Sequence, residues 1–319
     1  MAKNVAVGVD VGGTMTKVGL VDLDGNMYGY SEFSTKKHKA FNGFLDELSQ
    51  NFNALIEKAE GEINVVGLGI GAPNANYHRG TIEHAANLEW KGVVPLVDEL
   101  NKRFDKPIYV TNDANAAAIG EMIYGKAKGM KDFIVITLGT GLGGGVVSNG
   151  KLVYGHDAQA GELGHIVIDY QGRWTGLGRR GGLEAYVSST GLKRTVFFLL
   201  CDSTKESVLR DYSYNDLHGE IITNAAADGD PIAREAYEIT GEILGKALAN
   251  FTTFSHPEAF FLLGGLAKAG KWIFEPTQKY LDEYLLPFYK GKVKLMPSGM
   301  IGKNAAILGA SALVWDHHK

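Results

Sequence analysis

The stretch NVAVGVDVGGTMTKVGLVDLDGN, residues 4–26, decides the fold of this chain. Its apolar run at 4–10 and the segment 17–22 predict two strands of a hairpin joined by a glycine turn. The turn residues at 24–26 predict a second hairpin, with a third strand at 27–33. The opening segment is therefore expected to form three consecutive antiparallel strands.

The same plan returns in the second half, where FIVITLGTGLGGGVVSNGKLVY occupies residues 133–154. Strands are predicted at 133–138, 145–148 and 151–154. Glycines separate the first two, and the hairpin turn Asn149-Gly150 separates the last two. A unit of strand, glycine turn, strand, turn and strand thus occurs twice, which indicates a duplicated β-meander core.

Apolar periodicity predicts further elements around these meanders. Helices are expected at 41–59, 95–104, 114–124, 230–254 and 304–314, and strands at 65–70, 108–111 and 259–263. The fold class is therefore α/β, with two lobes that each hold a mixed β-sheet flanked by helices. Since no linker rich in Pro or Ser occurs, the lobes should pack closely. We expect 1–115 plus 304–319 to form a small N-terminal lobe and 116–303 a large C-terminal lobe.

Composition excludes several classes of protein. The 319 residues are 45% hydrophobic and 21% charged, which is ordinary for a globular chain. No run of about 18 apolar residues is present, so no membrane span is expected. The net charge of −4 argues against a nucleic-acid partner. Cys201, the single cysteine, allows neither an intrachain disulfide nor a cysteine metal cluster. Asp10 comes too early for a signal peptide, so a cytoplasmic location is expected.

Glycine is unusually frequent: 42 of the 319 residues are glycine, about 13%, where ~7% is usual. Its clusters follow predicted strands, where the backbone can approach a ligand closely. In the first cluster Asp10 ends a strand, Gly12-Gly13 exposes amides, and Thr14 and Lys17 follow. Such amides and hydroxyls suit a phosphate tail, with the carboxylate facing Mg²⁺ or its waters. The alternative is a simple hairpin with a capping aspartate.

The second cluster, residues 137–145, repeats this arrangement around Thr140 and Gly141. It also fits G-x-G-x-x-G, but a dinucleotide-binding fold needs a helix after the glycines and a strand is predicted here. One phosphate-type hairpin in each half indicates a nucleotide held between two lobes.

Polar residues at other segment ends are candidates for a second ligand. Asp113, after Asn112, could cap a helix or act as a general base beside a hydroxyl substrate. Glu162 and His165 lie close enough in sequence to bind vicinal hydroxyls together. Glu184 is either a helix N-terminal acid or a further contact to the same ligand.

Taken together, these motifs resemble the ROK family of sugar kinases, within the actin-like, hexokinase-type ATPase fold. Residues 10–14 are similar to the family's first phosphate loop and 139–141 to its second. Residues 112–117 resemble the segment that holds the catalytic aspartate, and 162–165 resemble its ExGH element. The pair Gly264-Gly265 resembles the loop beside the adenosine. The resemblance covers nearly the whole chain.

One segment departs from the family pattern. Most of the family follows ExGH with C-x-C-G-x-x-G-C-x-E, whose cysteines and the ExGH histidine bind a structural zinc. Thr175, Leu177 and Gly182 stand at the three cysteine positions. Zn²⁺ needs about four N or S ligands, so no structural zinc is expected. We expect Arg179 and Arg180 to order residues 170–184 by ion pairing instead.

The resemblance implies an ATP-dependent hexose kinase that makes the 6-phosphate, with glucose as the expected substrate. Asp113 is the expected catalytic base, and Asp10 is expected to hold Mg²⁺ through water. The expected sugar ligands are Asn87, Asn112, Asp113, Glu162, His165 and Glu184. The expected ATP ligands are Asp10, Gly12, Gly13, Thr14, Lys17, Thr140, Gly141, Gly264 and Gly265. The family also implies a homodimer.

Three alternatives stay open at this stage. The preferred sugar could be N-acetylmannosamine, N-acetylglucosamine, mannose, fructose or allose in place of glucose. A sugar-sensing regulator of the same family would bind sugar without catalysis. A non-enzymatic, actin-like assembly protein would not need the sugar-type residues at 112–113, 162–165 and 184.

Overall fold

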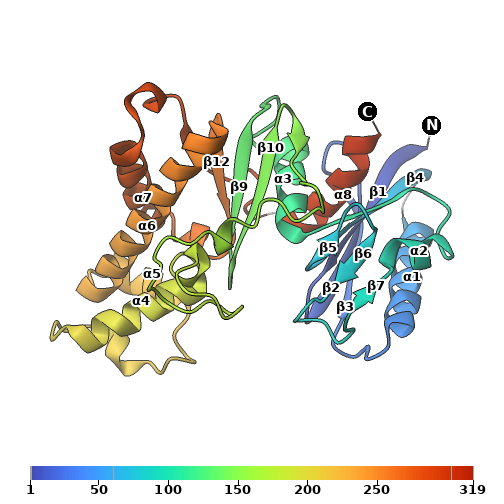
Figure 1. Ribbon diagram of the computed structural model, residues 1–319. Coiled ribbons are helices and arrows are strands. Elements are labelled where there is room, and N and C mark those ends of the chain that lie inside the picture. The colour runs from blue at the N-terminus through green and yellow to red at the C-terminus, as the bar shows by residue number, and fades with distance from the viewer. Residues whose placement is uncertain (1, 60, 303, 319) are drawn as a thin grey trace.

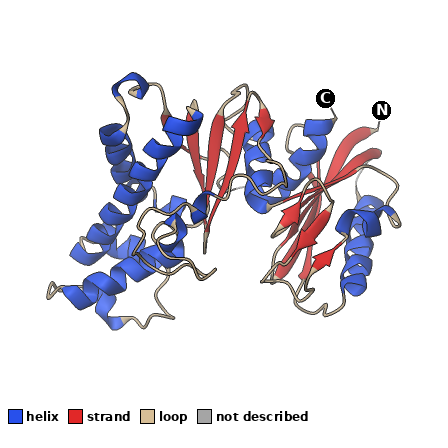
Figure 2. Ribbon diagram, viewed as in Figure 1, coloured by secondary structure: helices blue, strands red, loops and turns tan. Residues whose placement is uncertain are grey.

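Two mixed β-sheets of matching topology form the core of the molecule, as a computed structural model shows (Figure 1). The structure describes residues 2–59, 61–302 and 304–318. Each sheet has five strands and begins with an antiparallel meander, to which two further parallel strands are added. Helices cover both sheets (Figure 2). The duplicated meander predicted from the sequence is thus present, and the two-lobed α/β fold is that of the actin-like proteins implied by the family resemblance.

The first sheet has the strand order β3-β2-β1-β4-β8. Its strands are β1 (Lys3–Val11), β2 (Met15–Val21), β3 (Met27–Ser34), β4 (Ile63–Gly71) and β8 (Ile108–Thr111). Helix α1 (Phe41–Lys58) packs on β2 and β3, while α8 (Ala305–His317) packs on β1 and β4. A small sheet and one short helix complete this lobe: β5 (Ala75–Asn76), β6 (Thr81–Glu83), β7 (Val93–Val94) and α2 (Leu96–Asn101). The last helix of the chain therefore returns to the first lobe.

The second sheet has the equivalent order β11-β10-β9-β12-β13. Its strands are β9 (Phe133–Leu138), β10 (Leu142–Ser148), β11 (Lys151–Leu152), β12 (Ala259–Leu263) and β13 (Lys294–Pro297). Four helices join this lobe: α4 (Ser189–Asp202), α5 (Gly219–Ala227), α6 (Pro231–Ser255) and α7 (Lys271–Tyr284). Helix α3 (Asp113–Tyr124) packs on β9, β10 and β11. Short 3₁₀ turns lie at η1 (Leu163–His165), η2 (Leu183–Ala185), η3 (Val208–Asp211), η4 (Leu266–Ala269) and η5 (Pro287–Tyr289).

Local sequence explains where the longest helix begins. The Asp230 side chain caps α6 by accepting a hydrogen bond from the Ala233 amide (2.9 Å), and Pro231 occupies the first turn. This pair is favoured at helix starts because the cap satisfies a free amide and proline needs no partner there. The predicted start of this helix is confirmed.

The lobes meet where α3 crosses α8 (Figure 1). A Cβ atom added to Gly309 of α8 would lie 2.7 Å from the carbonyl oxygen of Ala116 in α3. Such a distance is below any real carbon–oxygen contact, so the two backbones touch only because residue 309 is glycine. A third apolar cluster, separate from the cores of the two lobes, fills the region around this crossing.

The structure differs from the sequence prediction at several places. Strand β10 begins at Leu142 instead of 145, so three glycines lie inside it. A Cβ at Gly145 would lie 2.6 Å from that of Ala118, because α3 presses directly onto this strand. The predicted helix 95–104 is shorter and ends at Asn101. Within the described ranges, no helix combines the length and apolar character needed to cross a membrane.

Candidate functional site

A cavity of about 980 Å³ opens between the lobes, where strand ends of both sheets face each other. Most of the predicted site residues line it: Asp10, Asn87, Asn112, Asp113, Thr140, Gly141, Glu162, His165, Glu184, Gly264 and Gly265. Gly12, Gly13, Thr14 and Lys17 are not part of this lining. The cleft therefore brings together residues from both halves of the chain, including all those predicted to bind sugar.

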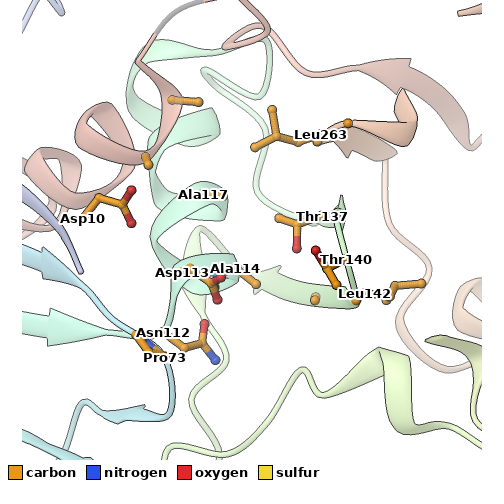
Figure 3. A pocket seen from close by; sticks show the side chains of 18 of the residues that line it. Asp10, Pro73, Asn112, Asp113, Ala114, Ala117, Thr137, Thr140, Leu142 and Leu263 are labelled. Atoms are coloured by element: carbon orange, nitrogen blue, oxygen red, sulfur yellow. Dashed lines mark hydrogen bonds between the residues drawn. The ribbon is translucent and has the colours of Figure 1, made fainter. Parts of the chain in front are cut away.

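Asp113 stands at the start of α3, directly after strand β8 (Figure 3). Asn112 is the residue that caps this helix, because its side chain accepts a hydrogen bond from the Asn115 amide (2.7 Å). The Asp113 carboxylate accepts a hydrogen bond from the neighbouring Ala114 amide (2.9 Å) and lines the cleft. Surrounding protein raises the pKa of Asp113 by desolvation, against the lowering effect of the backbone amides. Asp113 is thus available for chemistry that a capping residue could not perform.

Asp10 is the second-last residue of strand β1 and lines the same cleft. Burial raises the pKa of Asp10 to about 6, Lys17 opposes this rise, and the charge of Asp113 adds to it. Its carboxylate accepts no hydrogen bond from the part of the chain that the structure describes. In Figure 3, Asp10 lies on one side of Asp113 and Thr140 on the other. Two desolvated, mutually repelling carboxylates are an arrangement that favours a bound cation.

The first glycine loop lies next to the cleft and packs on a segment that lines it. The Gly12 amide donates to the Met15 carbonyl (3.0 Å), and the Thr14 carbonyl accepts the Thr35 amide (2.9 Å). A Cβ on Gly13 would lie 2.7 Å from the carbonyl oxygen of Asn87, so this glycine packs on the segment that carries a predicted sugar ligand. The direct contact of this loop with phosphate stays a prediction.

The second glycine loop forms the opposite wall. Within it the Gly139 amide donates to the Gly141 carbonyl (3.0 Å), while Thr140 is exposed to the cleft. Glu184 in η2 accepts a hydrogen bond from the Leu142 amide (3.1 Å) and fills the space beside Gly141. Glu184 therefore ties the predicted sugar side of the cleft to the predicted phosphate side.

Glu162 directly precedes η1 and His165 is the last residue of η1, with 3.8 Å between Glu162 Oε2 and His165 Nε2. Burial raises the pKa of Glu162, His165 lowers it, and the charges of Asp113 and Glu184 raise it further. Glu162, Asp113 and Glu184 line the same cavity, so the acidic groups share one site. It can accept several hydroxyl hydrogen bonds.

The segment between η1 and η2 folds into a hairpin without metal ligands. Thr175 packs its methyl group toward Gly182 (a Cβ there would lie at 2.8 Å), and Leu177 is 69% exposed. These residues do not fit a zinc ion, since His165 is the one N or S donor left. The expectation that Arg179 and Arg180 order this hairpin by ion pairing is wrong: neither forms an ion pair with the residues that the structure describes.

Several cleft residues were missed from the sequence. Lys268 in η4 follows Gly264-Gly265 and projects from the predicted nucleotide side, and its place after that glycine pair was an available signal. Met300, Ile301 and Gly302 line the same side from the loop between β13 and α8. No motif marks that loop, so only the fold brings it to the cleft.

Known proteins resemble this chain over its whole length. A sequence model of the ROK family matches residues 6–317. A glucokinase from Thermotoga maritima is 33% identical over 98% of each chain. A solved ROK family glucokinase from Streptomyces griseus, in complex with glucose and AMPPNP, has a TM-score of 0.79 at 31% identity, and the match covers 98% of this chain and 99% of that one. A xylose repressor from Bacillus subtilis is 27% identical over 98% of this chain but 77% of its own length.

Proposed function

The chain belongs to the ROK family, and we propose that it is an ATP-dependent glucokinase that transfers the γ-phosphoryl group of ATP to the 6-hydroxyl of glucose. The observation that carries this proposal is the position of Asp113. Its carboxylate is free of the capping role, stands in the interlobe cleft and faces the second glycine loop (Figure 3). The full-length glucokinase relatives support glucose as the acceptor.

In the proposed reaction, Asp113 accepts the proton of the 6-hydroxyl while that oxygen bonds to the γ-phosphorus. The bond from the γ-phosphorus to the bridging oxygen breaks, and ADP leaves with the electron pair. Desolvation strengthens Asp113 as a base by raising its pKa, and general-base catalysis of this type contributes about 10²–10⁴-fold. The rest of the acceleration comes from positioning and charge neutralisation in the cleft.

The residues on the nucleotide side fit Mg²⁺. Asp10 is a desolvated carboxylate with no hydrogen-bond donor among the described residues, and hard oxygen ligands of this kind suit a hydrated magnesium ion. When bound, the ion would neutralise phosphate charge. We assign Thr140 and Gly141, with Gly12, Gly13, Thr14 and Lys17 of the first loop, to the phosphates, and Gly264-Gly265 to the adenosine.

The sugar is assigned to the opposite end of the cleft. Asn87, Asn112, Glu162, His165 and Glu184 supply acceptors and donors for its hydroxyl groups. Buried polar groups of this type reject a sugar that lacks the matching hydroxyl, because the protein group is then left unpaired. Closure of the lobes over the sugar would exclude water that otherwise hydrolyses ATP.

Three expectations stay predictions: a homodimer, a cytoplasmic location, and the division into 1–115 plus 304–319 against 116–303. For the last, the packing of α8 on the first sheet and of α3 on the second gives support.

A coupled ADP-release assay across hexoses, with intact-mass detection of the product, tests the function. We expect glucose 6-phosphate to form faster than the products of N-acetylmannosamine, N-acetylglucosamine, mannose, fructose or allose. Asp113→Asn should retain glucose binding by calorimetry but lose about 10²–10⁴-fold in kcat. Glucose binding by the wild type without any turnover would support a sugar-sensing regulator instead, and near-normal kcat in the variant would overturn the role of Asp113.

A further inference from the structure

The hairpin between His165 and Glu184, two residues of the proposed sugar site, has no cysteine at the three positions where the family pattern implies a zinc site. Its ends are joined by backbone contacts: Val167 bridges Gly182, and the Leu183 amide donates to the Ile166 carbonyl (3.0 Å). These bonds align the two arms with each other. They do not fix the hairpin to the rest of the lobe.

Arg173 attaches the middle of the hairpin to helix α4. Its guanidinium donates to the Gly191 carbonyl (3.2 Å) and to the Thr195 hydroxyl (2.9 Å), both on helix α4. It also reaches the Ala185 carbonyl (3.4 Å), one residue after Glu184. One side chain from the hairpin thus joins the η2 turn and α4, as a multidentate metal ion would join its ligands.

Tyr186 packs beneath this cation and extends the network. The Arg173 guanidinium lies 4.7 Å from the centre of the Tyr186 ring, a cation–π distance. The Tyr186 hydroxyl accepts the Arg173 backbone amide (2.9 Å) and donates to Asp169 (3.1 Å). A second arginine, on α4, also joins that helix to the hairpin: Arg194 donates to the Trp174 carbonyl (2.8 Å).

We propose that Arg173, supported by Tyr186 and Arg194, is the positioning group that holds the Glu162–His165 and Glu184 arms of the sugar site in place, where the family pattern implies a zinc ion. We call Arg173, Tyr186 and Arg194 the arginine clamp. A guanidinium suits this task because its Nη1 alone lies within reach of the Ala185 and Gly191 carbonyls and the Thr195 hydroxyl, and the group stays charged when partly buried. Across the described ranges, no group of three or more His, Cys, Asp or Glu side chains could hold a metal ion in its place.

The test compares Arg173→Met with Arg173→Lys and with the control Arg210→Met. Arg210 donates to the carbonyls of Leu200 (2.9 Å), in the last turn of α4, and of Lys205 (3.0 Å), just after that helix, so its loss removes the same chemistry without touching the hairpin. We expect Arg173→Met to raise the glucose KM about tenfold and the ATP KM less than about threefold. Arg173→Lys should recover part of the effect, and Arg210→Met should leave both KM values unchanged.

Two further readouts do not depend on catalysis. The amides of Ile168, Gly181 and Leu183 bond within the hairpin, so hydrogen exchange should accelerate there in Arg173→Met and not in Arg210→Met. Wild-type protein should contain less than about 0.1 equivalents of zinc and keep its activity after chelator treatment and return of Mg²⁺.

The kinetic part of this inference rests on the proposed glucokinase activity, and the outcomes separate the two. A wild type inactive on glucose, together with faster exchange in Arg173→Met, would reject the function and support the clamp. Unchanged exchange with a glucose KM within about twofold of the wild type would overturn the clamp. Stoichiometric zinc whose removal abolishes glucose turnover would overturn it as well.

Discussion

Replacing Asp10 with asparagine should stabilise the ligand-free protein while damaging its function. Burial raises the pKa of Asp10 from the ordinary 3.8 to about 6, so the folded state disfavours the ionised form. Each pH unit of such a difference corresponds to about 1.4 kcal/mol, which makes ionised Asp10 cost about 3 kcal/mol. Because the folded pKa is the higher one, this cost is full above about pH 6 and disappears below about pH 4.

Urea unfolding of wild type and Asp10→Asn at pH 7.5 and at pH 4, without nucleotide or Mg²⁺, measures this effect. The variant should be more stable by up to about 3 kcal/mol at pH 7.5, and the difference should vanish at pH 4. Turnover of glucose should fall at the same time, since the proposed magnesium ligand is lost. A stability difference that is zero at pH 7.5, or that is the same at both pH values, would refute the electrostatic reasoning.

Asp22 provides a control of opposite sign. Burial favours its protonation, but hydrogen bonds from Lys3 and Asn26 outweigh it and lower the pKa of Asp22 to about 2. Its contribution is therefore present above pH 3.8 and is lost as the pH falls through about 2. Asp22→Asn should destabilise the protein by about 2 kcal/mol at pH 7.5.

Three other predictions concern the buried Glu121 of α3 and two residues of the cleft. Glu121, fully buried on α3, accepts hydrogen bonds from the backbone amides of Lys126 (2.7 Å) and Gly299 (2.9 Å). Glu121→Ala leaves both amides unpaired and should lower the unfolding free energy by about 3–6 kcal/mol. Glu121→Gln should lower it less in the same urea titration. The acid limb of kcat/KM for glucose should lie above pH 3.8, because the pKa of Asp113 is raised and its protonated form cannot accept the substrate proton; a rate that stays flat down to pH 4 would contradict this role. The Glu184 carboxylate accepts the Leu142 amide at the edge of the cleft. Glu184→Gln should therefore cost more free energy in glucose binding, calculated from the rise in glucose KM, than in folding, measured as the loss of unfolding free energy. Steady-state kinetics and denaturation together would check this.

Much of the fold follows from local patterns in the sequence. The two meanders were predictable because glycine turns separate short apolar runs, and the predicted strands at 108–111, 133–138 and 259–263 match the structure residue for residue. The strands of the small sheet, two or three residues long, carry too few side chains for any periodicity to appear.

Helix α7 shows a second limit, because tertiary packing overrides its sequence. Pro276 lies inside this helix, where proline removes a hydrogen bond. A Cβ on Gly241 of α6 would lie 2.6 Å from Pro276, so the two helices approach closely along the glycines of α6. Packing of this kind depends on a partner distant in sequence and leaves no local signal.

The candidate site was predictable in its residue types but not in its internal contacts. Asn112 and Asp113 are both helix-capping residue types, and only the structure separates their roles by assigning the cap to Asn112. Glu184 could be named as a ligand, yet its bond to Leu142 depends on how η2 meets β10. The attachment of the hairpin by Arg173 instead of Arg179 or Arg180 likewise required the three-dimensional position of α4.

The close backbone contact between Gly309 of α8 and Ala116 of α3 couples the positions of the two lobes mechanically. The two helix backbones are in direct contact at that point, with no flexible side chain between them. A tilt of one lobe would therefore displace helix α3, which begins at Asp113. A single methyl group at position 309 would therefore push the two helices apart and displace the start of α3, and with it Asp113, the proposed base.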